Sequence, residues 1–375
     1  MQINRRILSK NDCGPFARWR GRPARLTFAL VFAFVVSLSG TSLAVNGRPA
    51  SRSNHEPLST EVSVGPALAP KAAGDRAVTG SRSSGQITAV QVAAGQSHTL
   101  VLASDGTVWA WGNNDYGQLG NGDFSRPIAP VQVKGLSGVV AVAAGGNHSM
   151  ALKSDGSVWA WGSNMEYQLG LPGQGLYREP IQISTLNGIV SIDAGTRHSM
   201  AVRSDGTVIA WGDNNSGQLG NEAVAGRTYY PVPVTGLADV VGVRGGDRHS
   251  LALRRDGTVW AWGENFYGQL GDGTQIARRA PVQVTGLTSV IDIAAGAQHS
   301  AVLLSDGTVW VWGSNGMHQL GDGTTVDSLA AKQVAGLSAI SAISAGAYHT
   351  LATRSDGSVW GWGMNSSGQL AQADL

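Results

Sequence analysis

The chain has 375 residues, which is enough for two average domains or for one large all-β domain. Its 52 glycines and its low content of charged residues, 14%, favour many short strands over helices. The first 44 residues hold seven of the 27 basic residues and one of the 25 acidic residues, so the remaining chain has a formal charge of −4. Because nucleic-acid binding requires a concentrated basic surface, we predict no nucleic-acid partner.

Residues 1–44 are predicted to form a secretory signal peptide. Basic residues precede the apolar core Leu26–Leu38, and Ser42 and Ala44 have the spacing of a cleavage site. The alternative is an uncleaved anchor, because the apolar stretch is just long enough to span a bilayer. We therefore expect a secreted or extracytoplasmic protein with no membrane attachment after cleavage. The only cysteine, Cys13, lies in this leader, so the mature chain has no disulfide and no thiolate ligand.

Residues 45–86 are rich in Pro, Ser, Gly and Ala, which is typical of a linker. From Ile87 to the end, one unit of about 50 residues is repeated six times, and a fixed period of this size indicates a repeat architecture. Each unit has four candidate strands; in the second unit they are VVAVAAG (139–145), HSMALK (148–153), SVWAWG (157–162) and PIQI (180–183).

An Asp-Gly pair separates the second and third candidate strands of every unit, at residues 105–106 in the first. This pair predicts a two-residue type I′ turn. With that turn, Leu100 opposes Trp111 and Leu102 opposes Trp109, so these side chains share one bulky face while the other face is small. Since both faces are apolar, both must be covered, and stacking identical sheets around an axis achieves this.

We therefore predict an all-β fold, a β-propeller of four-stranded blades, with six blades formed by residues 87–375. The last unit stops before its fourth strand, so an upstream segment such as Glu61–Val64 or Arg76–Thr79 is expected to close the ring. The alternative is a ring that lacks a seventh blade.

The histidine at the head of each unit suggests catalysis, since His98 precedes Thr99 and Asp105. A catalytic triad, however, activates one hydroxyl in one pocket, and six symmetric copies argue against that role. We predict that the chain is not an enzyme, that it binds no metal, because equivalent positions on separate blades diverge, and that it has no cofactor. A structural role is predicted for His98, His148, His198, His249, His299 and His349, and for Trp111, Trp161, Trp211, Trp262, Trp312 and Trp362.

The repeat resembles the regulator-of-chromosome-condensation type of propeller repeat. The shared elements G-x-x-H-[ST], D-G-x-V-x-x-W-G-x-N and Q-L-G occur together in residues 95–120 and 296–321, and the resemblance covers about residues 87–375. It implies a propeller, although that family usually has seven blades. Its namesake activity is nucleotide exchange on a nuclear small GTPase, which a signal peptide argues against.

The loops vary where the strands are nearly constant. Tyr167 and His318 replace a glycine that recurs at Gly117, Gly217, Gly268 and Gly368, and they are strained if that position requires a positive φ. Because Tyr, Met and Arg are enriched at protein interfaces, these loops predict a binding surface. The candidate partner-binding residues are Tyr116, Met165, Tyr167, Phe266, Tyr267, Met317, His318, Tyr229, Tyr230, Arg278 and Arg279.

These observations favour a secreted, non-catalytic scaffold that presents variable loops to a protein partner, for example as an inhibitor of another protein. One alternative is a carbohydrate- or cell-wall-binding surface protein, because exposed aromatic residues also stack on sugars. The other is a nucleotide-exchange regulator of a small GTPase, as in the family namesake.

Overall fold

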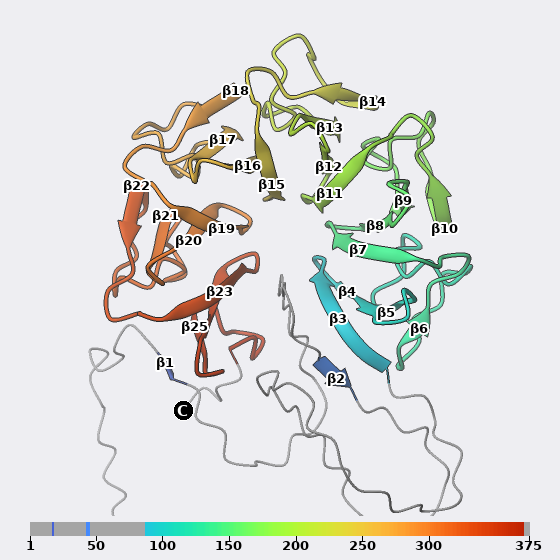
Figure 1. Ribbon diagram of the computed structural model, residues 1–375, viewed down its shortest axis with the longest axis horizontal. Helices are drawn as coiled ribbons and strands as arrows, with labels where there is room; N and C mark the ends of the chain where they lie inside the picture. The colour runs from blue at the N-terminus through green and yellow to red at the C-terminus, as the bar shows by residue number, and fades with distance from the viewer. Residues whose placement is uncertain (1–16, 19–42, 46–86, 371–375) are drawn as a thin grey trace, which may run out of the picture.

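The computed structural model describes residues 17–18, 43–45 and 87–370, in which strands and turns occur without a helix. Six sheets follow one another in chain order and are arranged in a ring, with the first strand of each repeat nearest the centre (Figure 1). The described residues include no helix with the length and apolar character needed to span a bilayer. The prediction of an all-β propeller with six blades is confirmed.

Each sheet forms one blade, numbered here from one to six. Blade one contains β2 (Leu43–Val45), β3 (Ile87–Ala94), β4 (His98–Ala103), β5 (Val108–Gly112) and β6 (Val131–Gln132). Blade two contains β7 (Val139–Ala144), β8 (His148–Lys153), β9 (Val158–Ser163) and β10 (Leu176–Gln182), and blade three contains β11 (Ile189–Ala194), β12 (His198–Arg203), β13 (Val208–Gly212) and β14 (Thr228–Pro233). Blade four contains β15 (Val240–Gly245), β16 (His249–Arg254), β17 (Val259–Gly263) and β18 (Arg278–Gln283). Blade five contains β19 (Val290–Ala295), β20 (His299–Leu304), β21 (Val309–Gly313) and β22 (Ser328–Gln333), and blade six contains β23 (Ile340–Ala345), β24 (His349–Arg354), β25 (Val359–Gly363) and β1 (Ala17–Arg18).

The Asp-Gly hairpin differs from the predicted type I′ turn. A positive φ occurs at Gly106 (78°) but not at the aspartate before it, as expected for a type I turn followed by a left-handed glycine. The longer loop pairs Val101 with Trp109 and Leu102 with Val108. The predicted pairing of Leu102 with Trp109 is therefore wrong by one residue, and a shift of one residue places β5 side chains on the opposite face.

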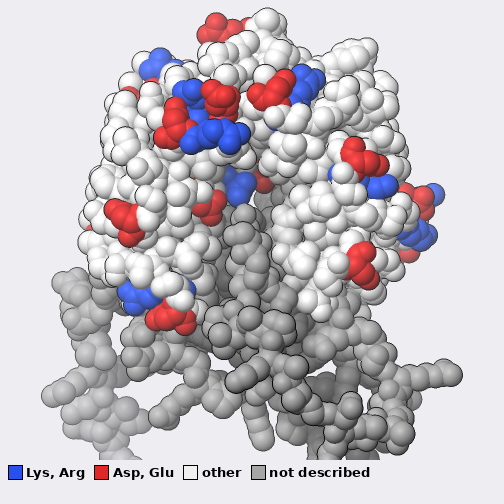
Figure 2. Space-filling model, viewed as in Figure 1, with Lys and Arg blue, Asp and Glu red and all other residues white. Residues whose placement is uncertain are grey.

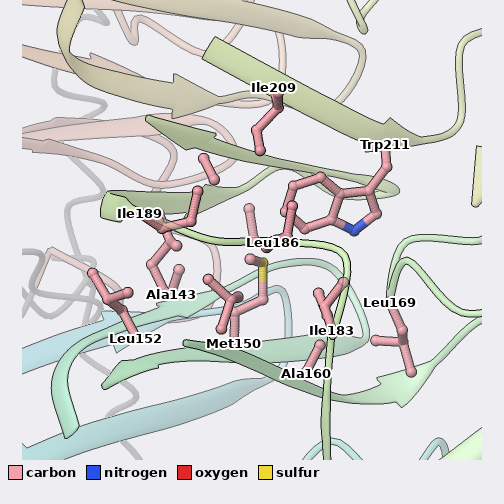
Figure 3. Packing of buried hydrophobic residues seen from close by; sticks show 14 residues of the cluster. Ala143, Met150, Leu152, Ala160, Leu169, Ile183, Leu186, Ile189, Ile209 and Trp211 are labelled. Carbon is pink, nitrogen blue, oxygen red and sulfur yellow. The ribbon is translucent and has the colours of Figure 1, made fainter. Parts of the chain in front are cut away.

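In the observed register, the second tryptophan of blades two to six points into the preceding blade. Trp161 is completely buried in a cluster that includes Leu100 and Val133 of blade one. Figure 3 shows the equivalent Trp211 of blade three beside Ile183 of blade two. Burying a tryptophan stabilises such an interface by about 4–6 kcal/mol as an upper value.

The first tryptophan of the repeat is less buried than expected. It is partly exposed in all five blades that have it, at Trp109, Trp159, Trp260, Trp310 and Trp360. Trp159, Trp260, Trp310 and Trp360 still pack against the clusters between blades, so the second tryptophan of the repeat lies inside each cluster and the first lies at its edge.

Blade six obtains its fourth strand from far upstream. Ala17 and Arg18 in β1 pair antiparallel with Gly361 and Trp360 in β25. The segments predicted to donate this strand, residues 61–64 and 76–79, lie outside the described residues. Because β1 belongs to the predicted leader, cleavage after Ala44 would remove this pairing.

Candidate functional site

A hydrogen-bonded relay joins blade one to blade two. The Ser149 hydroxyl donates to the backbone carbonyl of Gln118 (2.8 Å), and His98 Nε2 lies 2.9 Å from Ser149 Oγ. Because the hydroxyl has a single proton, His98 Nε2–H must donate to Ser149 Oγ. The Trp161 indole N–H donates to the same Gln118 carbonyl (2.9 Å).

The same relay recurs at the four junctions that follow. Its members are His148, Ser199, Gln168 and Trp211; His198, Ser250, Gln218 and Trp262; His249, Ser300, Gln269 and Trp312; and His299, Thr350, Gln319 and Trp362. Among the described residues, blade one has no equivalent of this relay at Thr99 and Trp111. The buried Thr99 hydroxyl has no hydrogen-bond partner in the described part of the chain, and Trp111 is only partly buried.

The relay has the wrong proton arrangement for nucleophilic catalysis. A catalytic histidine accepts the serine proton, whereas here the serine proton points to a carbonyl and the imidazole donates. Burial lowers the pKa of His98 and His198 to about 4, and burial lowers the pKa of His148, His249 and His299 to about 3, so all five are neutral at pH 7. This arrangement fits a role in joining blades.

Two sets of variable loops lie at the same end of the blades. In blade one, the Asn114 side-chain amide donates to the carbonyls of Asp123 (3.1 Å) and Ser125 (2.8 Å), which fixes the tip loop against the loop that follows it. Asn164, Asn214, Asn265 and Asn315 act in the same way. We call this end the loop face; it comprises residues 113–130, 163–175, 213–227, 264–277 and 314–327. The opposite end, with the Asp-Gly turns, is the turn face.

Most of the predicted partner-binding residues lie on or beside the loop face. Phe266 (66% exposed) and Tyr230 (59%) are the most exposed of these aromatic side chains. Tyr116, Met165, Tyr267, Met317 and His318 are also exposed, whereas Tyr167 and Tyr229 are partly buried.

The two predicted arginines make intramolecular contacts. The Arg278 guanidinium forms an ion pair with Asp272 (2.8 Å), and Arg279 Nη2 donates to the carbonyl of Val224 in the adjacent blade (2.6 Å). Both contacts order loops on the loop face.

Tyr167 and His318 adopt the conformation that glycine adopts elsewhere. Their φ angles are 63° and 61°, and that of Gly117 is 80°. A methyl group on Gly117 would lie 2.9 Å from the Cα of Arg178 in the next blade, which shows how closely the blades approach. For a residue other than glycine, this conformation costs about 1–2 kcal/mol.

Further apolar side chains on the loop face escaped the sequence analysis. Phe124, Ile276 and Val326 are 44%, 61% and 69% exposed. Their sequence context could have identified them, because an apolar residue inside a polar loop is unusual, but the prediction was drawn mainly from the aromatic residues of the tip loops.

The turn face has an apolar feature of its own. Val139 pairs with Lys153 and Ala141 with Leu152, so that Val140 is an extra residue whose side chain points into solvent. The equivalent exposed residues in four other blades are Val90, Val190, Val241 and Ile291. Figure 2 shows acidic and basic residues interspersed on the face that it displays, without a large patch of one sign.

Charged residues on inner strands come from three consecutive blades. Arg244 lies 3.6 Å from Asp292, and Asp193 accepts the backbone N–H of Gly245 (2.7 Å). Burial raises the pKa of Asp193 to about 6, and the nearby Arg244 charge opposes this rise. No group of three or more His, Cys, Asp or Glu side chains suited to a metal ion occurs within residues 17–18, 43–45 and 87–370.

Several solved structures have a similar fold. Yeast RCC1 (Prp20), in a structure with Kap60, is 27% identical with a TM-score of 0.68, and the match covers 79% of this chain and 74% of that chain. Human WBSCR16 is 25% identical with a TM-score of 0.63, over 74% and 72% of the two chains.

Matches to curated sequences are local. Protein RCC2 of Homo sapiens is 46% identical over 41 residues, and the probable E3 ubiquitin-protein ligase HERC3 of Homo sapiens is 44% identical over 55 residues. These segments are 11% and 14% of this chain but only 8% and 5% of the relatives. The profile of the RCC1-like domain matches residues 60–375, and the chain therefore belongs to the RCC1-like domain family.

Proposed function

We propose that this chain is a secreted, non-catalytic scaffold whose loop face binds a protein partner, with inhibition of that partner as one outcome. The observation that carries this proposal is the exposure of Phe266, Tyr267, Met165 and Met317 on loops of blades two, four and five, at the same end of blades that the relay joins. Exposed aromatic and methionine side chains on a rigid support are typical of binding hot spots.

Solved structures of family members support a protein partner. Yeast RCC1 (Prp20) was crystallised with Kap60, and another structure of Prp20p from Saccharomyces cerevisiae was described together with its binding to Gsp1p and histones. By analogy, the propeller of this chain serves as a platform for another protein.

Affinity capture tests this proposal. The full chain, tagged at its C-terminus, is incubated with culture supernatant and envelope extract of the source organism, and bound proteins are identified by mass spectrometry. Phe266→Ser combined with Met165→Ser should abolish capture, whereas the turn-face control Val140→Ser combined with Val190→Ser should retain it. Capture that survives the loop-face changes, or that only the control abolishes, would contradict the proposal.

Secretion has its own test. The mass of the chain recovered from the medium should correspond to a start at Val45. An intact N-terminus on a chain in the cytosol would argue against secretion.

Nucleotide exchange on a small GTPase is the second candidate, supported by the similarity to Prp20. Release of a fluorescent guanine nucleotide from small GTPases of the source organism would be accelerated by the full chain if this function is correct. No acceleration is expected if the chain is a secreted scaffold.

A further inference from the structure

A pocket of about 250 Å³ lies between the outer parts of blades two and three. Its walls include Tyr229, Tyr230 and Pro231 of β14, together with Pro172, Ser184 and Thr185 from two loops of blade two. This volume lies just below the range of about 300–1,000 Å³ for sites that hold drug-sized ligands, so it suits a single ring.

The chemistry of the walls excludes a charged ligand. The lining residues include no Lys, Arg, His, Asp or Glu, so nothing would compensate a buried phosphate, carboxylate or ammonium group. Ser184 and Thr185 are exposed, and their hydroxyls make no side-chain hydrogen bond to any other described residue. The pocket therefore combines aromatic faces with hydroxyls that are free to bind.

The tyrosines of the pocket are held in place by their neighbours. The rings of Tyr229 and Tyr230 lie 4.0 Å apart between centroids, and Tyr167 packs against Tyr229 at 5.8 Å. Tyr167 makes this contact from its left-handed backbone conformation. Arg227 joins the two blades beside the stack through an ion pair with Glu166 (2.8 Å).

Strain of this kind persists where the surrounding structure maintains it, and it is concentrated at functional sites. At the matching position, four other blades have a glycine at a positive φ, where the backbone is unstrained, and blade five has His318 at a φ of 61°. Only in blade two does a tyrosine occupy that position, and it supports the aromatic wall of this pocket.

We infer that this pocket is a binding site for a neutral sugar ring. The apolar C–H face of a pyranose packs on Tyr230, and its hydroxyls pair with Ser184 and Thr185. An apolar peptide side chain of similar size would fill the pocket but would leave these hydroxyls without partners, which costs affinity. The site does not depend on the proposed protein partner.

The test uses cellohexaose, maltohexaose and chitohexaose as probes. Binding of each to the full chain is measured by isothermal titration and by saturation-transfer NMR. At least one probe should bind, and Tyr230→Ala should weaken it about tenfold or more, as expected for the loss of one stacked ring. Ser184→Ala combined with Thr185→Val should weaken it as well.

Matched controls separate the pocket from the rest of the surface. Tyr267→Ala removes an exposed tyrosine outside the pocket and should leave saccharide affinity unchanged, and an unchanged melting temperature shows that each variant is folded. Failure of all three saccharides to bind, or undiminished binding by Tyr230→Ala, would overturn the inference. Loss of protein capture with intact saccharide binding would count against the proposed function alone.

Discussion

Two threonines at equivalent positions should respond in opposite ways to the same substitution. Thr350 and Thr99 are both completely buried, and valine has nearly the same shape as threonine. Thr350 Oγ1 lies 3.0 Å from His299 Nε2 and donates to the carbonyl of Gln319 at 3.0 Å. Thr99 Oγ1 has no hydrogen-bond partner among the described residues.

Thr350→Val removes both hydrogen bonds and leaves the buried N–H of His299 without an acceptor, so it should lower the free energy of unfolding by about 2–3 kcal/mol. Thr99→Val removes a buried hydroxyl that makes no hydrogen bond, so it should leave the free energy of unfolding unchanged or raise it by about 1 kcal/mol.

Urea denaturation measures both effects. It is followed by circular dichroism and by tryptophan fluorescence, because coincident curves with equal slopes are required before free energies are compared. Equal destabilisation by the two substitutions would refute the reasoning, since it would mean that the Thr99 hydroxyl makes a stabilising hydrogen bond like that of Thr350.

Three further predictions follow from the structure. The five buried histidines of the relay have pKa values below the unfolded value of 6.5, so the unfolded chain binds more protons than the folded chain as pH falls. The free energy of unfolding should therefore be highest above about pH 6.5 and should fall steeply towards about pH 4. Urea midpoints measured at successive pH values test this prediction. Asp193 has the opposite effect, because burial raises its pKa from 3.8 to about 6 and the folded chain therefore holds a proton that the unfolded chain loses. Asp193→Asn should gain stability relative to the unmodified protein as pH rises from about 4 to about 6, and the difference should stay level at higher pH; a constant difference from about pH 4 to about pH 6 would count against this. His318→Gly should raise the melting temperature by relieving a positive φ at an exposed side chain, whereas Gly268→Ala should lower it, because a methyl group there would lie 2.6 Å from the Cα of Leu329.

The fold was predictable because the sequence contains six copies of the same strand and turn pattern. The period of about 50 residues and the tryptophan positions indicated blades that stack around an axis. The strand register was not predictable, because an Asp-Gly pair fits both a two-residue type I′ turn and a longer loop with one left-handed glycine, and the two alternatives differ by one residue. The strand that completes blade six was also missed, because β1 (Ala17–Arg18) lies in a segment with the composition of a leader.

The candidate site was predictable only in part. Variation at Tyr167 and Phe266 marked the loops, but sequence alone did not place the two loop sets on one face. The Asn114 amide that connects them bonds to the Asn121 side chain and to the carbonyls of Asp123 and Ser125, and backbone acceptors cannot be recognised from the sequence. The arginines at 278 and 279 looked available for a partner, yet their guanidinium groups are engaged within the protein.

The central claim is that the repeated histidines join neighbouring blades through hydrogen bonds, so that the loops can vary in sequence. Measuring which ring nitrogen of each histidine carries the proton tests this claim most directly. Long-range ¹H–¹⁵N correlation NMR identifies the protonated ring nitrogen of each histidine as pH is lowered. The relay predicts that five histidines remain neutral with the proton on Nε2 from about pH 7 to about pH 5. Protons on Nδ1, or titration of these histidines near the ordinary value of 6.5, would contradict it.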